Sequence, residues 1–354
     1  MSTSFDLRKI KILQAEITSD CNARCPQCPR NYYGGRTVEN LPVTRWNTQE
    51  LGNMFSMKFV EQLETVYICG TYGDPMMHPD IVEIVDWFQQ VNPKIKIGLH
   101  TNGSLGKLTT YKKLAERKVF IAFGIDGLED TNHLYRRRVK WSHVMERAKQ
   151  FIDCGGRAFW DFIVFRHNQH QVSSARKLAN NLGFSSFNVK KTSRFLNRQH
   201  QYQSSQGVLN SYGEEEYKIF PPTLAEYINT EAESIHDTSL LDTTKISCNA
   251  KKIGEIYVAA DGMVFPCGWL HDRMYGPYIE THSDHIKMLE VIERVGKENT
   301  NCRTATIESI VDGPWFKHIS ESWEDHTRYE RCAVMCGNCI NPIGTQNAEI
   351  SYKK

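Results

Sequence analysis

Three cysteines near the amino end have the type and the spacing of ligands for a metal centre. Cys21, Cys25 and Cys28 lie in the stretch ITSDCNARCPQCPRN, in a CxxxCxxC pattern. A redox pair needs only two thiols, and a closed structural zinc site needs a fourth protein ligand. Three thiolates can instead bind three irons of a cubane iron–sulfur cluster and leave the fourth iron open. The spacing favours such a cluster, with zinc binding and thiol redox chemistry as the alternatives.

The other cysteines gather towards the carboxyl end. Cys69 and Cys154 stand alone, and six follow residue 247: Cys248, Cys267, Cys302, Cys332, Cys336 and Cys339. The amino end, MSTSFDLRKIKI, lacks the apolar core of a secretory signal. We therefore expect a cytoplasmic protein, in which thiols stay reduced and indicate metal or redox chemistry rather than disulfides.

The composition is typical of a soluble globular protein. The 354 residues are 40% hydrophobic and 24% charged, with a formal net charge of +2. No apolar run approaches the roughly 20 residues of a membrane span. The small net charge gives no strong attraction to nucleic acids. We expect neither a membrane location nor a nucleic-acid substrate.

Alternating strands and helices must position the first three cysteines. The apolar pattern predicts strands at about 10–17, 65–69, 94–100, 119–125, 158–165 and 187–191. Helices are expected between them at about 48–63, 80–90, 107–117, 141–154 and 172–183. This order predicts parallel βα units, as an open sheet or a barrel. The CxxxCxxC segment follows the first strand, at the end where barrels carry their chemistry.

The alternation of predicted strands and helices ends after residue 194. Residues 194–245 are polar and without a clear period, so we expect a long connection or surface segment. A β-hairpin is expected at 254–267, with its turn at 260–262, and helices near 283–296 and 307–318. We expect three parts: a barrel core at 1–195, a connecting segment at 196–245 and a carboxy-terminal metal-binding domain at 246–354.

With its CxxxCxxC motif after a first strand and its βα units, the chain resembles the radical S-adenosylmethionine (SAM) superfamily. The resemblance implies an α/β fold, a partial (βα)6 TIM barrel. It also implies a [4Fe–4S] cluster on Cys21, Cys25 and Cys28 whose open iron binds SAM. One electron would cleave SAM to a 5′-deoxyadenosyl radical, which abstracts a hydrogen from the substrate.

Three further motifs support the resemblance. TYGDP stands where the family has Gly-Gly-Glu-Pro. This position implies that Gly73 lets the backbone approach SAM closely and that Asp74 accepts a hydrogen bond from the SAM ammonium. HTNG resembles the family's loop near the SAM ribose, with Thr101 and Asn102 as polar contacts.

The third motif, GIDGLEDTNHLYR, resembles the SIDG…YR stretch of relatives that carry carboxy-terminal clusters. It implies roles in SAM binding for Asp126 and for Arg136, the candidate partner of the SAM carboxylate. A solvated basic face over residues 136–138 is the alternative for Arg136.

The carboxy-terminal cysteines resemble a SPASM or twitch auxiliary-cluster domain. Cys248 and Cys267 flank Gly262 in a C-x13-G-x4-C pattern, which a β-hairpin would close. The resemblance implies one auxiliary [4Fe–4S] cluster on Cys248, Cys267, Cys336 and Cys339, with Cys332 as an alternative ligand. A structural zinc site is the other interpretation of these cysteines.

These features together predict a radical SAM enzyme with an auxiliary iron–sulfur domain. Its cluster would be reduced by a flavodoxin- or ferredoxin-like donor, and its substrate is expected to be a peptide or protein side chain. The alternatives are a small-molecule radical SAM dehydrogenase or natural-product enzyme, and a non-catalytic metal-binding or thiol-redox protein. The sequence does not assign the catalytic side chains or the substrate.

Overall fold

The computed structural model describes residues 4–196, 202–233 and 240–338, and its centre is a single curved sheet. The sheet has eight strands in the order β10-β9-β1-β2-β3-β4-β5-β6. The first six along the chain are β1 (Ile12–Ala15), β2 (Thr65–Ile68), β3 (Lys96–Thr101), β4 (Phe120–Gly124), β5 (Arg157–Val164) and β6 (Ser186–Lys191). These six pair in parallel with their neighbours, which confirms the predicted βα alternation. The fold is an open partial barrel.

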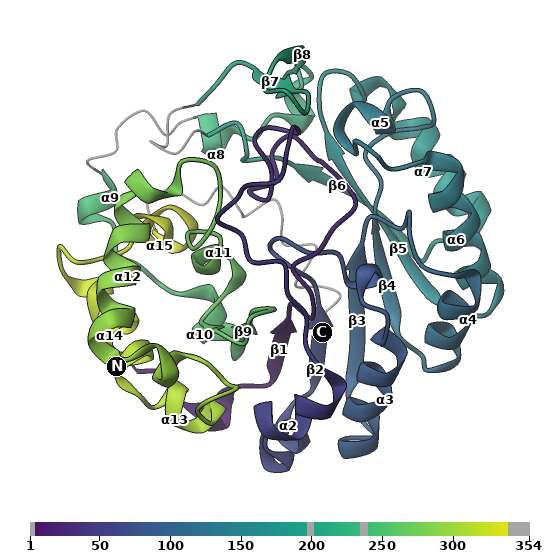
Figure 1. The fold of residues 1–354 in the computed structure, drawn as a ribbon. Coiled ribbons are helices and arrows are strands. Elements are labelled where there is room, and N and C mark those ends of the chain that lie inside the picture. Colours follow the sequence, from purple (N-terminus) through teal and green to yellow (C-terminus); the bar gives the residue numbers. More distant parts are fainter. Residues whose placement is uncertain (1–3, 197–201, 234–239, 339–354) are drawn as a thin grey trace.

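Helices cover the outer face of the curved sheet (Figure 1). The helices between the first six strands are α1 (Leu51–Met54), α2 (Met57–Gln62), α3 (Ile81–Val91), α4 (Leu108–Glu116), α5 (Asn132–Tyr135), α6 (Trp141–Asp153) and α7 (Val172–Leu182). The helix predicted at 48–63 is wrong as one element. Phe55 is extended, with φ −131° and ψ 119°, and Ser56 accepts a hydrogen bond from the Phe59 amide to begin a new helix.

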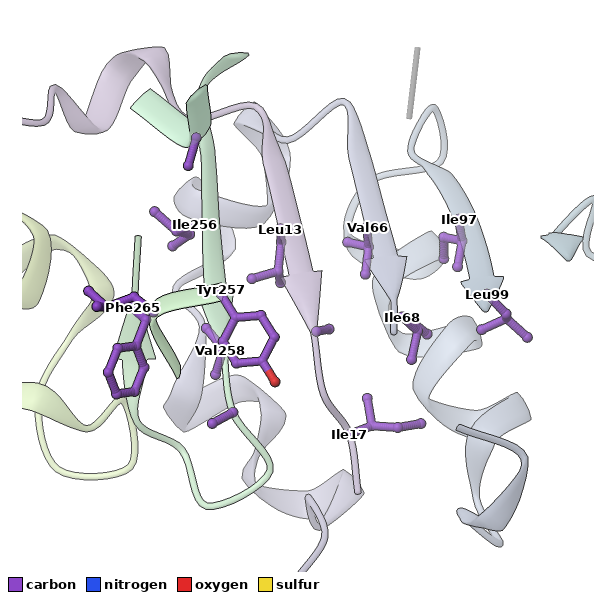
Figure 2. Close-up of a cluster of buried hydrophobic side chains, with 14 of the residues drawn as sticks. Leu13, Ile17, Val66, Ile68, Ile97, Leu99, Ile256, Tyr257, Val258 and Phe265 are labelled. Carbon is purple, nitrogen blue, oxygen red and sulfur yellow. The ribbon is translucent and has the colours of Figure 1, made fainter. Parts of the chain in front are cut away.

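Strand alternation divides the apolar side chains between two faces. Figure 2 shows Leu13, Val66, Ile68, Ile97 and Leu99 together on neighbouring strands, within the large core that the helices complete. The other face of the strands carries a second, smaller cluster, formed by Tyr67, Phe120, Ala122 and Phe159.

The predicted carboxy-terminal hairpin is present and joins the barrel sheet. It consists of β9 (Glu255–Val258) and β10 (Val264–Phe265), which pair antiparallel. Strand β9 also pairs in parallel with β1, with Ala15 opposite Val258. The hairpin therefore extends the sheet at the edge beside the first cysteine loop, and the three-part division of the chain stays a prediction.

Further helices surround the hairpin. They are α10 (Asn249–Ile253), α11 (Gly268–His271), α12 (Ser283–Val295), α13 (Ile307–Val311), α14 (Pro314–Glu321) and α15 (Glu330–Cys336). The connecting segment contains β7 (Gln206–Leu209) and β8 (Glu215–Ile219), an antiparallel hairpin, and the short helices α8 (Thr230–Glu233) and α9 (Leu240–Thr243). None of the helices in the described ranges combines the length and apolar character needed to cross a membrane.

Candidate functional site

The CxxxCxxC loop leaves the carboxyl end of β1 and is fixed at its first residues. The Asp20 carboxylate accepts hydrogen bonds from the Cys21 amide (2.9 Å) and from the Arg30 guanidinium (3.1 Å). Arg30 is buried and also donates to the carbonyl of Ser19. The Cys28 amide donates to the Cys25 carbonyl at 3.0 Å. These hydrogen bonds hold the backbone of the loop in a compact turn.

Side chains from two other loops reach the sulfur atoms. Asn102 Nδ2 lies 3.8 Å from Cys21 Sγ, and Arg136 Nη1 lies 3.8 Å from Cys25 Sγ. Burial and the nearby Asp74 carboxylate raise the pKa of Cys21 well above its usual value. Burial raises the pKa of Cys25 to about 11, although Arg136 opposes the shift. Both thiols would release a proton on binding iron. The N–H groups of Asn102 and Arg136 lie beside the sulfur atoms and could donate to the resulting thiolates.

Asp74 joins the loops after β2 and β3. Its carboxylate accepts hydrogen bonds from Thr101 Oγ1 (2.8 Å) and from the amides of Asn102 (2.7 Å) and Met76 (3.0 Å). Burial raises the pKa of Asp74, and the hydrogen bonds oppose that shift. The four predicted residues of these motifs therefore lie together, with the Thr101 hydroxyl facing Asp74. Gly73 is required by packing, because a Cβ there would lie 1.7 Å from the Thr18 carbonyl oxygen.

Asp126 and Arg136 form a buried ion pair. Arg136 Nε lies 2.6 Å from Asp126 Oδ2, and Asp126 Oδ1 accepts a hydrogen bond from the Ile163 amide at 2.7 Å. The Arg136 side chain is only 16% exposed, so the alternative of a solvated basic face is wrong for this residue. Burial disfavours the guanidinium charge, but Asp126 and Cys25 outweigh this effect and raise the pKa of Arg136. At Gly124, a Cβ would lie 2.5 Å from Arg136 Nη2, so glycine makes room for the pair.

Glu16 is a residue of this region that the sequence reasoning missed. Its carboxylate is buried and accepts hydrogen bonds from the amides of Tyr72 (2.7 Å) and Gly73 (3.0 Å). The signal in the sequence was a lone acidic residue at the end of an apolar strand, just before the cysteine motif. A carboxylate that is buried without hydrogen bonds costs free energy, so buried carboxylates are hydrogen-bonded. The donors to Glu16 include two amides of a predicted SAM-binding loop.

The carboxy-terminal cysteines line a cavity of about 480 Å³. Cys248, Cys267, Cys332 and Cys336 all border it, whereas Cys339 lies outside the described residues. The cavity is many times the ~30 Å³ that one water molecule occupies in the liquid, so it has room for a polynuclear cluster. Cys302 is buried and does not line the cavity.

The same cavity reaches the barrel. Its walls include Cys69 and Thr71 after β2, Pro29 beside the first cysteine loop, and Arg194 after β6. The Arg194 guanidinium donates to the Gln27 carbonyl at 2.7 Å. The cavity therefore extends from the carboxy-terminal cysteines to Pro29, which directly follows Cys28, whereas Cys21, Cys25 and Cys28 do not line it. Among the described residues, no three His, Cys, Asp or Glu side chains are arranged to bind a single metal ion.

Comparison of the sequence with known proteins finds one matching family model. Residues 15–172 match the model of the Radical SAM superfamily. GTP 3′,8-cyclase from Staphylococcus epidermidis is 27% identical over 150 residues, which are 42% of this chain and 44% of that protein. Human molybdenum cofactor biosynthesis protein 1 is 27% identical over 154 residues, 42% of this chain and 23% of the relative. The chain thus spans less than half the length of these curated relatives.

Solved structures share the fold at low sequence identity. SuiB from Streptococcus suis bound to SAM matches with a TM-score of 0.52 and 14% identity, over 91% of this chain and 77% of SuiB. The protein anSMEcpe with bound SAM matches with a TM-score of 0.52 and 15% identity, over 93% of this chain and 88% of that one. SuiB has also been solved with its precursor peptide SuiA, at a TM-score of 0.51 and 14% identity over 91% and 76% of the two chains.

Proposed function

This chain belongs to the radical SAM superfamily, and from that premise we propose that it cleaves SAM reductively to modify a peptide or protein side chain. The observation that carries the proposal is the convergence of Asn102 and Arg136 on the thiols of Cys21 and Cys25. A [4Fe–4S] cluster on Cys21, Cys25 and Cys28, with SAM on its open iron, would supply one electron and a 5′-deoxyadenosyl radical.

The chain's own residues would bind and orient SAM. Arg136 would donate hydrogen bonds to the SAM carboxylate, since Asp126 holds only its Nε at 2.6 Å. Asp74 would accept a hydrogen bond from the SAM ammonium, because a carboxylate has about four acceptor sites. Asn102 and Thr101 would hold the loop beside the ribose. Gly73 would allow the close approach of the backbone to the ligand.

An auxiliary [4Fe–4S] cluster is our proposal for the carboxy-terminal cysteines. Cys248, Cys267 and Cys336 line the cavity and would supply three ligands. Cys339 is our fourth ligand, as the sequence suggested. Cys332 remains the alternative, because it precedes Cys336 by one turn of α15 and lines the same cavity. The cluster would bind the substrate or accept an electron from the product radical. A flavodoxin- or ferredoxin-like protein would reduce the first cluster.

The substrate class has two candidates with support from different relatives. A peptide is favoured by the fold, because SuiB has been solved with a precursor peptide bound. A small molecule is favoured by the sequence relatives, which are named GTP 3′,8-cyclases. In both cases the cavity, which reaches from the carboxy-terminal cysteines to Pro29 beside the first cysteine loop, would hold the substrate.

Deuterium transfer distinguishes these candidates. The reconstituted protein would be incubated anaerobically with SAM, a reductant and either fully deuterated peptide pools or deuterated GTP. Deuterium in 5′-deoxyadenosine from the peptide pools alone would support the proposal, and deuterium from GTP alone would replace it with the small-molecule reaction. Stoichiometric zinc without SAM cleavage would instead identify a non-catalytic metal-binding protein.

A further inference from the structure

Glu16 connects three separate parts of the chain. It directly follows β1, and only 1% of its surface is exposed. One carboxylate oxygen, Oε1, accepts the amides of Tyr72 and Gly73, at 2.7 and 3.0 Å. The other oxygen, Oε2, accepts the hydroxyl of Tyr257 at 2.7 Å. Tyr257 belongs to β9, so one carboxylate holds both the loop after β2 and the carboxy-terminal hairpin.

A second set of contacts leads from the same loop to an auxiliary cysteine. The Thr71 amide donates to the Tyr257 hydroxyl at 3.3 Å, and Thr71 Oγ1 donates to the Gly268 carbonyl at 3.3 Å. Gly268 directly follows Cys267 in the sequence. The loop 71–74 is therefore bonded to the hairpin strand and to the residue beside a proposed cluster ligand.

The packing around Glu16 leaves little space for the loop to move. A Cβ at Gly70 would lie 2.6 Å from Glu16 Oε1, so the carboxylate and the loop backbone are in close contact. His271, which is 1% exposed, brings its Nδ1 within 3.8 Å of Glu16 Oε2, and its ring packs against Tyr72 and Tyr257. Burial lowers the pKa of His271, although the nearby Glu16 carboxylate opposes this shift. Charge-assisted hydrogen bonds in such a dry setting are strong and directional.

We propose that Glu16 and Tyr257 form a clamp through which the carboxy-terminal hairpin positions the SAM-binding loop, so that the affinity for SAM depends on both residues. The inference rests on the proposed function, since Gly73 and Asp74 are proposed contacts of SAM. Glu16 and Tyr257 are positioning residues, because they act through the backbone of residues 71–73. The clamp makes SAM binding sensitive to the hairpin that carries Cys267.

The test compares three conservative variants of the reconstituted holoprotein. Glu16→Gln keeps the shape but removes the charge, and Tyr257→Phe removes one hydroxyl. Tyr67→Phe is the matched control, because Tyr67 and Tyr257 both pair with Gln14, on opposite sides of β1. We expect the Kd for SAM to rise about tenfold in Glu16→Gln and about threefold in Tyr257→Phe, and to change less than twofold in Tyr67→Phe.

Two further readouts separate positioning from general loss of structure. The rate of SAM cleavage at saturating SAM should stay within about twofold of wild type, so that the KM for SAM rises while kcat does not. The double variant should lose less affinity than the product of the two single effects, because both residues serve one network. Equal effects in Tyr67→Phe and Tyr257→Phe would overturn the inference.

Amide hydrogen exchange tests the clamp without SAM. The amides of Tyr72 and Gly73 should exchange at least about tenfold faster in Glu16→Gln, while the amides of β4 keep their wild-type rates. Unchanged exchange at residues 72 and 73 would overturn the clamp, whatever the affinity for SAM. A wild-type protein that ignored SAM would instead refute the proposed function. The two failures are thus distinguishable.

Discussion

The two cysteine groups of this chain differ in what surrounds their sulfur atoms. The amino-terminal thiols receive N–H groups from Asn102 and Arg136, and a buried ion pair and a buried carboxylate lie close by. The carboxy-terminal thiols border an open cavity whose walls include Trp269, Trp323 and other apolar side chains.

This difference suits the two cysteine groups to different functions. The first group sits among fixed charges and hydrogen-bond donors, which suits a cluster that must also hold a charged ligand such as SAM. The second group lines a cavity, which suits a cluster that faces a substrate. Charged groups at strand ends are preorganised by the sheet, whereas the cavity is lined both by residues at strand ends and by helices from distant parts of the chain.

Loss of an amino-terminal ligand should have the largest effect. Cys21→Ala should abolish formation of 5′-deoxyadenosine, by at least about a thousandfold, because the electron comes from that cluster. High-performance liquid chromatography of anaerobic reactions measures the product. Cys302→Ala is the matched control, since Cys302 is a buried thiol outside both groups. Equal loss in both variants would contradict the assignment.

Loss of a carboxy-terminal ligand should remove the second cluster and leave the first cluster intact. Cys248→Ser should lower the iron content from about eight to about four atoms per chain and stop product formation. Uncoupled cleavage of SAM should remain, because the first cluster would be intact. Iron analysis and electron paramagnetic resonance measure both clusters. If the first cluster disappeared as well, our division of the ligands would be wrong.

Breaking the buried ion pair of Asp126 and Arg136 should destabilise the protein strongly. Arg136→Gln leaves the Asp126 carboxylate buried without its partner, and should cost about 3–5 kcal/mol in the free energy of unfolding. Arg137→Gln is the control, because its pair with Glu216 is partly exposed and worth about 1 kcal/mol or less. Urea unfolding measures both, and equal losses would contradict a special role for Arg136. Adding Asp126→Asn to Arg136→Gln should restore part of the loss.

The smallest expected effect is on how the stability of the protein depends on pH. Burial, with the charges of His133 and His170, lowers the pKa of His167 to about 4. Because its unfolded pKa is about 6.5, the unfolded chain binds the proton first as the pH falls. Stability should therefore be full above about pH 6.5 and decline by up to about 3 kcal/mol towards pH 4.

His167→Phe should remove most of this decline, because phenylalanine can stack on Phe165 as the imidazole does. His170→Gln, at an exposed position three residues later, should reduce the decline only slightly, because the charge of His170 is a smaller cause of the lowered pKa of His167 than burial. Thermal unfolding between pH 4 and 8 measures the three slopes. A wild-type slope in His167→Phe would show that another group is responsible.

The sequence predicted the barrel half better than the carboxy-terminal half, for physical reasons. The strands β1 to β6 follow local apolar periods, and the motifs lie at their ends, so topology alone brought Asp74, Thr101 and Asn102 together. The pairing of β9 with β1 joins residues about 240 positions apart, and no local pattern encodes it. The hairpin β7–β8 was missed because polar residues occupy both of its faces.

The roles of single side chains were less predictable than their positions. The sequence pattern predicted that Asp74 lies at the end of a strand. Whether its carboxylate faces a ligand or Thr101 depends on the loop after β3, which the pattern does not describe. Glu16 was overlooked because its partners, the amides of Tyr72 and Gly73, come from a segment more than 50 residues away. Buried polar contacts of this kind require the folded structure.

The central claim is that three thiols at the mouth of the barrel hold a cluster that cleaves SAM. The most direct measurement is 5′-deoxyadenosine released by anaerobically reconstituted protein after reduction with dithionite, with and without SAM. The account predicts about one or more equivalents per chain with SAM, and a change in the electron paramagnetic resonance signal of the reduced cluster when SAM binds. A reconstituted protein with full iron content that released no 5′-deoxyadenosine and showed no such change would contradict it.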